Sequence, residues 1–250
     1  MSDLVLQAAG IAKRFGGLTA VDNVNFDLRP HEIHAVIGPN GAGKTTFLAP
    51  LAGDQAPSEG RVFVNGNDIT HLPVRSRTRL GVGRTYQRSA VIGGFTALDM
   101  VRLAAFAHTG GWGGYLTTLA ASRRVTAIAR DALKRVALES RENTVTDALS
   151  HGEKRRLEIA AVLALDPNIL LLDEPLAGLG PDESHAVVDL VRDLKGHCSI
   201  VLIEHDIDVV FAIADRITVL DNGKVIASGL PNDVRENAEV QRAYLGLEDD

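Results

Sequence analysis

The sequence predicts an α/β fold in which a largely parallel sheet is combined with helices, and three patterns support this. Residues 169–172 and 199–203 are apolar without alternation, which is typical of parallel strands covered on both faces. A helical pattern over residues 183–194 separates these two runs. Earlier in the chain, a short apolar strand at 33–37 leads into a glycine-rich turn and then a helix. The 250 residues, 45 % of them hydrophobic, suffice for one large domain or a domain with a subdomain.

Composition limits where the protein works. The net charge of −6 with both signs mixed argues against a nucleic-acid binder. A single cysteine, Cys198, excludes an internal disulfide and favours a reducing cytoplasm. The start of the chain does not resemble a signal peptide, and we find no apolar run of membrane-spanning length. We therefore expect a protein outside the lipid that can still dock on something in a membrane.

The first part of the chain predicts β-structure. Residues 4–6 and 24–28 are strand-like, with Gly16 and Gly17 as a turn between them. Residues 61–64 form another strand pattern, ended by the hairpin pair Asn65-Gly66. A short helix is expected over 73–80, followed by extended chain over 81–87. These patterns predict an antiparallel β-subdomain and the first part of the core within residues 1–93.

Residues 94–165 change character, because strand formers thin out and Ala, Leu and Arg dominate. Helices are expected to begin at Thr96 and at Ser150 and to span 122–137, with a surface loop over 108–115. This predicts an inserted helical subdomain over 94–165. The α/β pattern then returns over 166–250, with a hairpin at 221–223 and a closing helix over 233–245, so that 1–250 is one domain.

Residues 38–46 fit the phosphate-binding P-loop pattern G-x-x-x-x-G-K-[ST]. The helix dipole and several backbone N–H groups converge on one point, and glycine lets the backbone approach an anion closely. Lys44 can reach the outer phosphates and the Thr45 hydroxyl can ligate Mg²⁺. A glycine-rich turn that binds nothing is disfavoured, since every fixed position is filled. The predicted nucleotide-binding residues here are Gly38, Pro39, Asn40, Gly41, Ala42, Gly43, Lys44, Thr45 and Thr46.

Two acids end the apolar run 169–172. Asp173 can hold the Mg²⁺ shell, and Glu174 can polarise the attacking water. Adjacent acids at a strand end could instead be solvated loop charges. A P-loop in the same chain favours the catalytic interpretation.

Ser150 and Glu153 form a capping-box pattern at the start of a helix. That local interpretation is complete in itself. However, Lys154, Arg155 and Arg156 crowd a helix N-terminus, where the dipole disfavours cations. An anion arriving at this end would relieve the conflict.

Taken together, these motifs resemble an ATP-binding-cassette (ABC) ATPase, in which the signature reads Leu-Ser-Gly-Gly-Gln. Residues 149–153 read Leu-Ser-His-Gly-Glu, so His151 and Glu153 depart while Ser150 and Gly152 are kept. The resemblance implies a P-loop NTPase with a RecA-like core. It also implies that Ser150, Gly152 and Glu153 contact ATP held on the P-loop of a second cassette subunit, either identical or a sister chain.

Other positions match the family in order. Phe15 stands where an aromatic ring stacks on adenine, although alone it would be interpreted as core. Gln87 matches the Q-loop, which touches Mg²⁺ and the water, and His205 matches the switch histidine, although a lone histidine after a strand is usually structural. Residues 177–180 occupy the D-loop without its usual aspartate. The implied catalytic residues are Glu174, His205, Lys44 and Gln87, and the implied metal ligands are Thr45, Gln87 and Asp173.

Within the family, the sequence is most similar to ATPases of branched-chain and hydrophobic amino-acid importers. The similarity rests on residues 14–21, 84–87, 177–179, 203–206 and 243–246. It implies uptake through a membrane permease at the cytoplasmic face of the plasma membrane, with a periplasmic solute-binding protein involved indirectly and no nucleic acid. Alternatives are a lipopolysaccharide-type export ATPase, a related importer, a non-transport ABC ATPase and a plain P-loop switch.

Overall fold

The computed structural model describes residues 4–86, 91–109 and 123–245. The chain divides into two compact units. The first takes Met1–Val82, Asn168–Glu174 and Leu194–Asp250, and the second takes Gly83–Pro167 and Pro175–Asp193.

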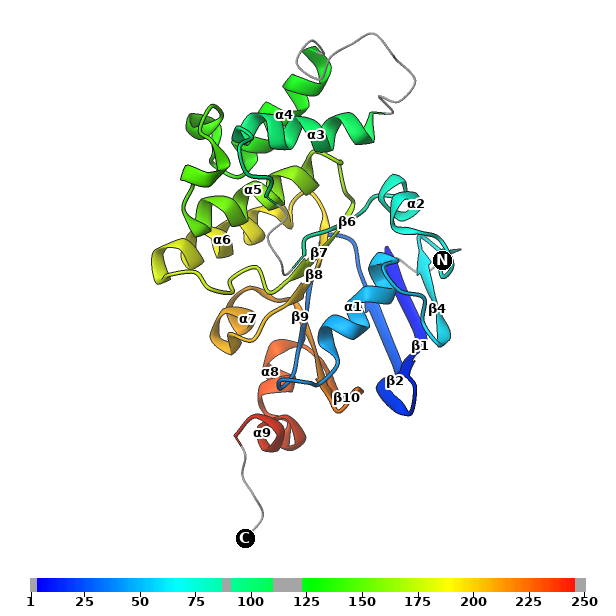
Figure 1. Cartoon of the computed structure of the whole chain (residues 1–250). Coiled ribbons are helices and arrows are strands. Elements are labelled where there is room, and N and C mark those ends of the chain that lie inside the picture. Colours follow the sequence, from blue (N-terminus) through cyan, green and yellow to red (C-terminus); the bar gives the residue numbers. More distant parts are fainter. Residues whose placement is uncertain (1–3, 87–90, 110–122, 246–250) are drawn as a thin grey trace. The chain divides into compact units, whose positions relative to one another are not determined.

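An antiparallel sheet opens the first unit (Figure 1). Its strands β1 (Leu6–Phe15), β2 (Leu18–Leu28), β4 (Glu59–Val64) and β5 (Asn67–Asp68) lie in the order β2-β1-β4-β5. This confirms the predicted antiparallel β-subdomain. The first two strands are longer than the predicted 4–6 and 24–28, because each extends almost to the Gly16-Gly17 turn.

The second sheet has the order β10-β9-β3-β8-β7-β6. Neighbours among β9 (Arg216–Asp221), β3 (Ile33–Ile37), β8 (Ser199–Ile203) and β7 (Ile169–Asp173) are parallel. Every residue of β3, β7 and β8 is buried, as the apolar runs without alternation predict. The edge strand β10 (Lys224–Gly229) is antiparallel to β9, and β6 (Val82–Arg84) ends the order at the other side.

Helix α1 (Lys44–Ala52) lies between the two sheets of the first unit (Figure 1). Phe47, Leu48 and Leu51 are fully buried in one apolar cluster that also contains side chains of both sheets. Burying one such side chain stabilises a fold by about 1.5–3 kcal/mol. The helix that follows the P-loop is therefore fixed by core packing on two sides.

The remaining helices of the first unit are α2 (Val74–Arg79), α7 (Ile207–Ile213), α8 (Pro231–Arg235) and α9 (Ala238–Leu245). The prediction of one closing helix over 233–245 is wrong, since two helices occupy this segment. Asn237 explains the break, because its side-chain oxygen accepts from the backbone N–H groups of Glu239 and Val240. This is N-cap geometry, so a new helix starts there.

The second unit contains α3 (Ala97–His108), α4 (Arg123–Arg135), α5 (His151–Leu163) and α6 (Pro181–Leu194), with short 3₁₀ turns at Glu139–Arg141 and Thr146–Ala148. Thr96 caps α3 by accepting from the backbone N–H of Asp99. Small and branched side chains such as Ala105, Ala129 and Leu133 are fully buried among α3, α4 and α5. The inserted helical subdomain of the predicted fold class is thus confirmed, while its bounds at 94–165 stay a prediction. From residue 110 onward, the predicted loop over 108–115 lies outside the described residues.

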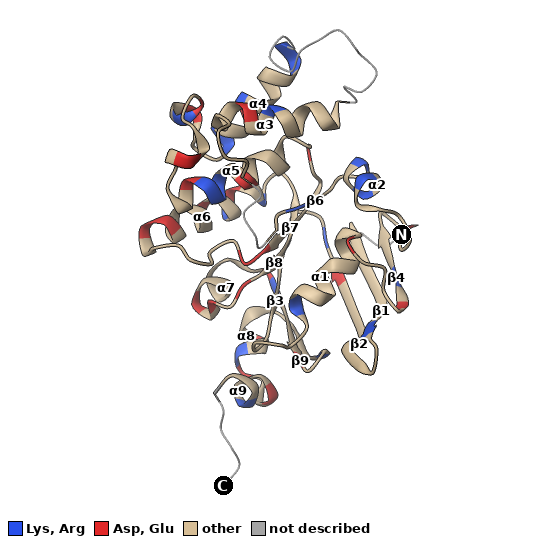
Figure 2. Ribbon diagram, in the orientation of Figure 1, with Lys and Arg blue, Asp and Glu red and all other residues tan. Residues whose placement is uncertain are grey.

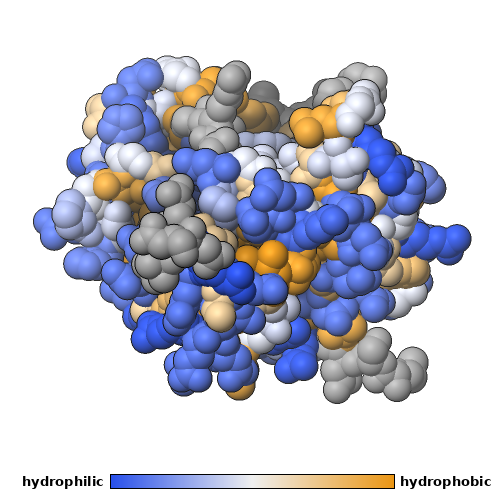
Figure 3. All heavy atoms as spheres, turned by 90° about the horizontal axis from the view of Figure 1, so that it is seen from below, coloured by the Kyte–Doolittle hydropathy of each residue, from blue (hydrophilic) through white to orange (hydrophobic). Residues whose placement is uncertain are grey.

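Charges of both signs are interspersed along the helices of each unit (Figure 2). The face drawn in Figure 3 is covered mainly by hydrophilic residues, with small hydrophobic groups between them. Within the described ranges, every helix is too short or too polar to cross a lipid bilayer.

Candidate functional site

The turn between β3 and α1 carries the predicted phosphate cradle. Gly41 and Gly43 have φ angles of 84° and 96°, in the left-handed region that favours glycine. A Cβ on Gly43 would lie 2.5 Å from the carbonyl oxygen of Ala20, and one on Gly38 would lie 2.1 Å from that of Leu220. Residues 38–46 therefore form one tight turn and the first turn of α1, with a backbone conformation that requires glycine.

Lys44 folds back over this turn. Its Nζ donates to the carbonyl oxygens of Gly38 at 2.7 Å and Pro39 at 3.1 Å. Burial lowers the pKa of Lys44, while the carboxylates of Glu174 and Asp173 act in the opposite direction. The ammonium group is thus held by two neutral carbonyls, and an anion in the turn would be a stronger partner.

Two oxygen-bearing side chains meet beside the turn. Asp173, the last residue of β7, is fully buried, and the Thr45 hydroxyl donates to its Oδ1 at 3.4 Å. Hydroxyl and carboxylate oxygens are the ligands that Mg²⁺ prefers, so this pair fits the cation. Among the described residues, no group of three or more His, Cys, Asp or Glu side chains could hold a metal ion.

Glu174 has an unusual backbone conformation. Its φ of 48° is in the left-handed region, and its N–H donates to the carbonyl oxygen of Ile203 at 2.9 Å. Such a conformation costs a non-glycine residue roughly 1–3 kcal/mol and is concentrated at functional sites. The hydrogen bond to the end of β8 therefore fixes the backbone of Glu174, from which its carboxylate side chain projects.

His205 and Phe15 are both exposed. The His205 side chain, after the end of β8, is 61 % exposed, and its Nδ1 lies 3.6 Å from Oε2 of the fully buried Glu204. Phe15 is 47 % exposed at the end of β1, so the alternative that it is a core residue is wrong. Lys13 Nζ lies 5.3 Å from the Phe15 ring centroid. Both side chains are thus accessible to a ligand.

Sequence reasoning missed two residues of this unit. Glu204 is buried beside His205, and an acid directly before the histidine was the available signal. The hydroxyl of Tyr244 in α9 is buried beside the backbone N–H of Gly38, although without the geometry of a full hydrogen bond. Burial raises the pKa of Tyr244. Gln87 lies outside the described residues, so its role stays a prediction.

The signature segment begins α5 in the second unit. Ser150 Oγ accepts from the Glu153 N–H at 3.2 Å, and Glu153 Oε2 accepts from the Ser150 N–H at 2.9 Å. The predicted capping box is thus confirmed. Arg141 donates to Glu153 Oε1 at 2.7 Å, and this bond contributes most to lowering the pKa of Glu153.

An anion also lies at this helix end, and it comes from the same chain. Oε1 of Glu183, in the first turn of α6, accepts from Ser150 Oγ at 2.7 Å and from the Gly152 N–H at 3.0 Å. Two of the three crowded cations have partners of their own. Arg155 pairs with Glu158 at 2.9 Å, and Arg156 donates to the carbonyl oxygen of Val136. The predicted electrostatic conflict is therefore relieved inside the unit.

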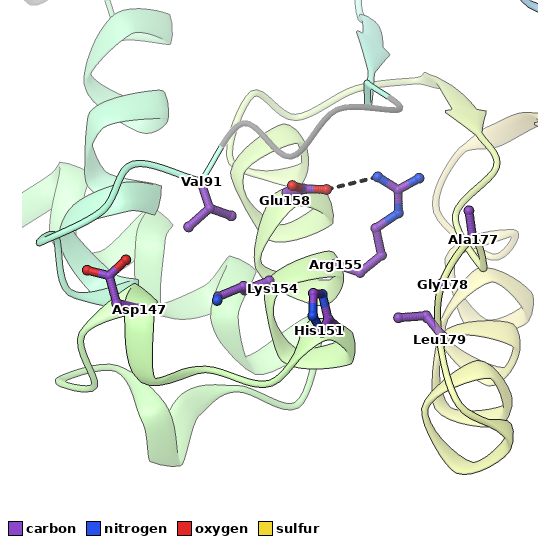
Figure 4. A pocket seen from close by; sticks show the side chains of 9 residues that line it. All are labelled: Val91, Asp147, His151, Lys154, Arg155, Glu158, Ala177, Gly178 and Leu179. Carbon is purple, nitrogen blue, oxygen red and sulfur yellow. Dashed lines mark hydrogen bonds and ion pairs between the residues drawn. The ribbon is translucent and has the colours of Figure 1, made fainter.

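A cavity of about 420 Å³ lies beside α5 in the second unit (Figure 4). The Arg155–Glu158 ion pair lines one part of it, and the Lys154 and Asp147 side chains line another (Figure 4). Residues 177–179 line a further side. Its lining thus combines both signs of charge with apolar groups, contributed by Val91, Asp147, His151, Lys154, Arg155, Glu158, Ala177, Gly178 and Leu179.

The fold and the P-loop turn define a P-loop NTPase. A family model described as "ABC transporter" matches residues 21–177, and one described as "Branched-chain amino acid ATP-binding cassette transporter" matches residues 224–250. The chain belongs to the ABC transporter family and is an ATP hydrolase of that type.

Two curated relatives are similar along their whole length. The high-affinity branched-chain amino acid transport ATP-binding protein LivG of Escherichia coli (strain K12) is 40 % identical over 254 residues, which cover 98 % of this chain and 99 % of LivG. The corresponding protein BraF of Pseudomonas aeruginosa is 37 % identical, with coverage of 98 % and 99 %.

Solved structures agree. The ADP conformation of the ATP-binding cassette MJ1267 matches with a TM-score of 0.87 and 26 % identity, covering 98 % of this chain and all of that one. A dimeric structure of the bacterial ABC transporter cassette MJ0796 matches with a TM-score of 0.77 and 26 % identity, covering 90 % and 98 %.

Proposed function

We propose that this chain is the ATP-hydrolysing subunit of an ABC transporter that takes up branched-chain or other hydrophobic amino acids. The observation that carries the proposal is the full-length similarity to LivG and BraF, together with the match of residues 224–250 to the branched-chain amino acid family model. The similarity favours import over lipopolysaccharide export.

The first unit would hold the nucleotide. The backbone N–H groups of residues 38–46 and the start of α1 would bind the phosphates, and Lys44 would exchange its carbonyl partners for phosphate oxygens. The exposed ring of Phe15 would stack on adenine. Its hairpin partner β2 supports this role, because β2 packs against the P-loop at Ala20 and Gly43.

Hydrolysis would follow at the ends of β7 and β8. Mg²⁺, held by Thr45, Gln87 and Asp173, would neutralise phosphate charge when bound. Glu174 would orient a water molecule and accept its proton as the water oxygen attacks the γ-phosphorus. The bond from the γ-phosphorus to the bridging oxygen would break, and ADP would leave with that oxygen. His205 would hydrogen-bond the γ-phosphate, and Lys44 would offset the charge that develops on it.

The second unit would complete the site of a partner cassette. Ser150, Gly152 and Glu153 would close over ATP that is bound to the P-loop of an identical or sister subunit. ATP would then favour the closed pair, and loss of the γ-phosphate would favour opening. The dimeric MJ0796 cassette supports such an arrangement.

Closing and opening of the two cassettes would be transmitted to a membrane permease. The chain would be bound to this permease peripherally, at the cytoplasmic face of the membrane. We assign the cavity of the second unit as the docking place for a permease segment, since its mixed charges and apolar groups suit a polar helix end. A periplasmic solute-binding protein would supply the solute to the permease.

Reconstitution of the chain with a membrane permease that co-purifies with it tests this function. We expect ATP hydrolysis to rise several-fold when the matching binding protein is added with leucine, isoleucine or valine. Stimulation by an unrelated solute, with no response to hydrophobic amino acids, would refute the assigned substrate class. Failure to hydrolyse ATP in any such complex would refute the transport role.

A further inference from the structure

The signature segment already holds an anion. The Glu183 carboxylate accepts from the Ser150 hydroxyl at 2.7 Å and from the Gly152 N–H at 3.0 Å. These are the two kept signature positions, and the proposed function gives them the partner's γ-phosphate. One carboxylate oxygen therefore occupies the donors that a phosphate oxygen would need.

Close packing surrounds this contact. A Cβ added to Gly152 would lie 2.8 Å from each of three Glu183 side-chain carbons, so the Glu183 chain lies directly over the glycine. Glu183 is only half-buried, and it starts from the first turn of α6, a different element from α5. A change of χ angles alone could move its carboxylate into solvent, because the side chain is long and partly exposed.

We infer that Glu183 is a phosphate-mimicking plug, which occupies the signature's anion position in the separate subunit and is displaced when the γ-phosphate of the partner's ATP arrives. The inference rests on the proposed function, since it concerns closure of two cassettes. Two anions do not share the same two donors, because their like charges repel at hydrogen-bond distance. A triphosphate with its greater charge wins the exchange, whereas an empty partner offers nothing to displace Glu183.

The plug sets a threshold for closure. When only a fraction of molecules has a free binding position, the apparent dissociation constant rises by the inverse of that fraction. If Glu183 occupies the position nine times in ten, removing it would tighten ATP-dependent closure about tenfold. A purely structural tie between α5 and α6 predicts the opposite, since its loss would loosen the signature and weaken closure.

The two possibilities separate in a sedimentation experiment on the full chain. Glu174→Gln is used as the parent to slow hydrolysis, and its self-association is measured against Mg-ATP concentration. Adding Glu183→Ala should lower the half-maximal ATP concentration about fivefold or more, and Glu183→Gln should lower it less. Asp182→Asn, the neighbouring acid in the same helical turn, is the matched control and should leave it unchanged.

Nucleotide binding by the separate subunit provides the second readout. Fluorescence titration at low protein concentration should give the same ATP affinity with and without Glu183. The inference is overturned if Glu183→Ala folds and leaves self-association unchanged or weaker. Because Glu183→Gln keeps the size of the side chain, the measurement remains possible if the alanine variant does not fold.

The parent separates this inference from the proposed function. If the parent associates with ATP and the Glu183 variants do not differ from it, only the plug is refuted. If neither parent nor variants associate at saturating ATP, alone or with the sister cassette, the two-cassette mechanism fails, and the plug fails with it.

Discussion

The P-loop and the signature segment are both proposed anion sites at a helix N-terminus, but they are built differently. The P-loop is shaped by backbone, since glycines at positive φ approach neighbouring carbonyls more closely than any side chain would allow. The signature segment is held by side chains, through Ser150, Glu153 and Glu183. A site built from backbone persists when empty, whereas one held by side chains can exchange partners. In the proposed mechanism, a phosphate cradle built from backbone is thus combined with a signature position whose partner can be exchanged.

The largest expected effect is on ATP hydrolysis in the first unit, which contains the P-loop. Glu174→Gln should keep ATP binding and lower turnover by about 100-fold or more, since it removes the proposed general base. Steady-state ATPase assays and a nucleotide titration measure the two quantities. Turnover within a few-fold of wild type would exclude this role for Glu174.

ATP binding to the P-loop of the first unit should depend on Lys44. Lys44→Ala removes charge-assisted hydrogen bonds to phosphate worth about 1.5–3 kcal/mol, so ATP affinity should fall roughly 10- to 100-fold. Fluorescence titration with ATP measures it. Lys224→Ala is the control, because Lys224 is an exposed lysine of the same unit in β10. Equal affinities in both variants would show that the P-loop lysine does not contact phosphate.

A substitution in the signature segment should affect association of the subunits and not nucleotide binding by the separate subunit. Ser150→Ala removes the cap of α5 and should cost about 1 kcal/mol of unfolding free energy. It should leave ATP binding by the separate subunit intact and weaken ATP-dependent association in the Glu174→Gln background. A loss of nucleotide affinity in the separate subunit would contradict the proposed division of roles between the P-loop and the signature segment.

The smallest effect concerns Tyr244. Tyr244→Phe removes the buried hydroxyl beside the Gly38 N–H. Because this contact lacks the geometry of a full hydrogen bond, ATP affinity should fall by no more than about twofold. Isothermal titration is sensitive enough to detect this change. Unchanged affinity and unchanged melting temperature would show that α9 does not support the P-loop.

The P-loop and the signature segment also differ in how completely the sequence predicts their contacts. The P-loop is predictable because its geometry is local, and positions 38–46 leave few other conformations. The capping box is equally local and was found. Glu183 was missed because its partners lie 31 and 33 residues away on another helix, and no short motif joins them. Pairings of that kind arise from tertiary packing, which a local pattern does not encode.

Some predicted ends of strands and helices are wrong, again because contacts with other parts of the chain or overlooked caps decide them. The first strands extend beyond their apolar runs because neighbouring strands support their polar ends. The single closing helix was wrong because the Asn237 cap, a local signal, was overlooked beside the apolar periodicity. The sequence does not decide between a core role and a ligand-binding role for Phe15, since hydrophobicity alone does not distinguish a buried ring from an exposed one.

The Arg141–Glu153 pair gives the departure from the family's glutamine a consequence for engineering. The guanidinium contacts both carboxylate oxygens, at 2.7 and 3.3 Å. Restoring glutamine at position 153 would leave Arg141 as an uncompensated cation near the signature. A consensus variant of this chain would therefore need both positions exchanged together, since the carboxylate of Glu153 compensates the charge of Arg141.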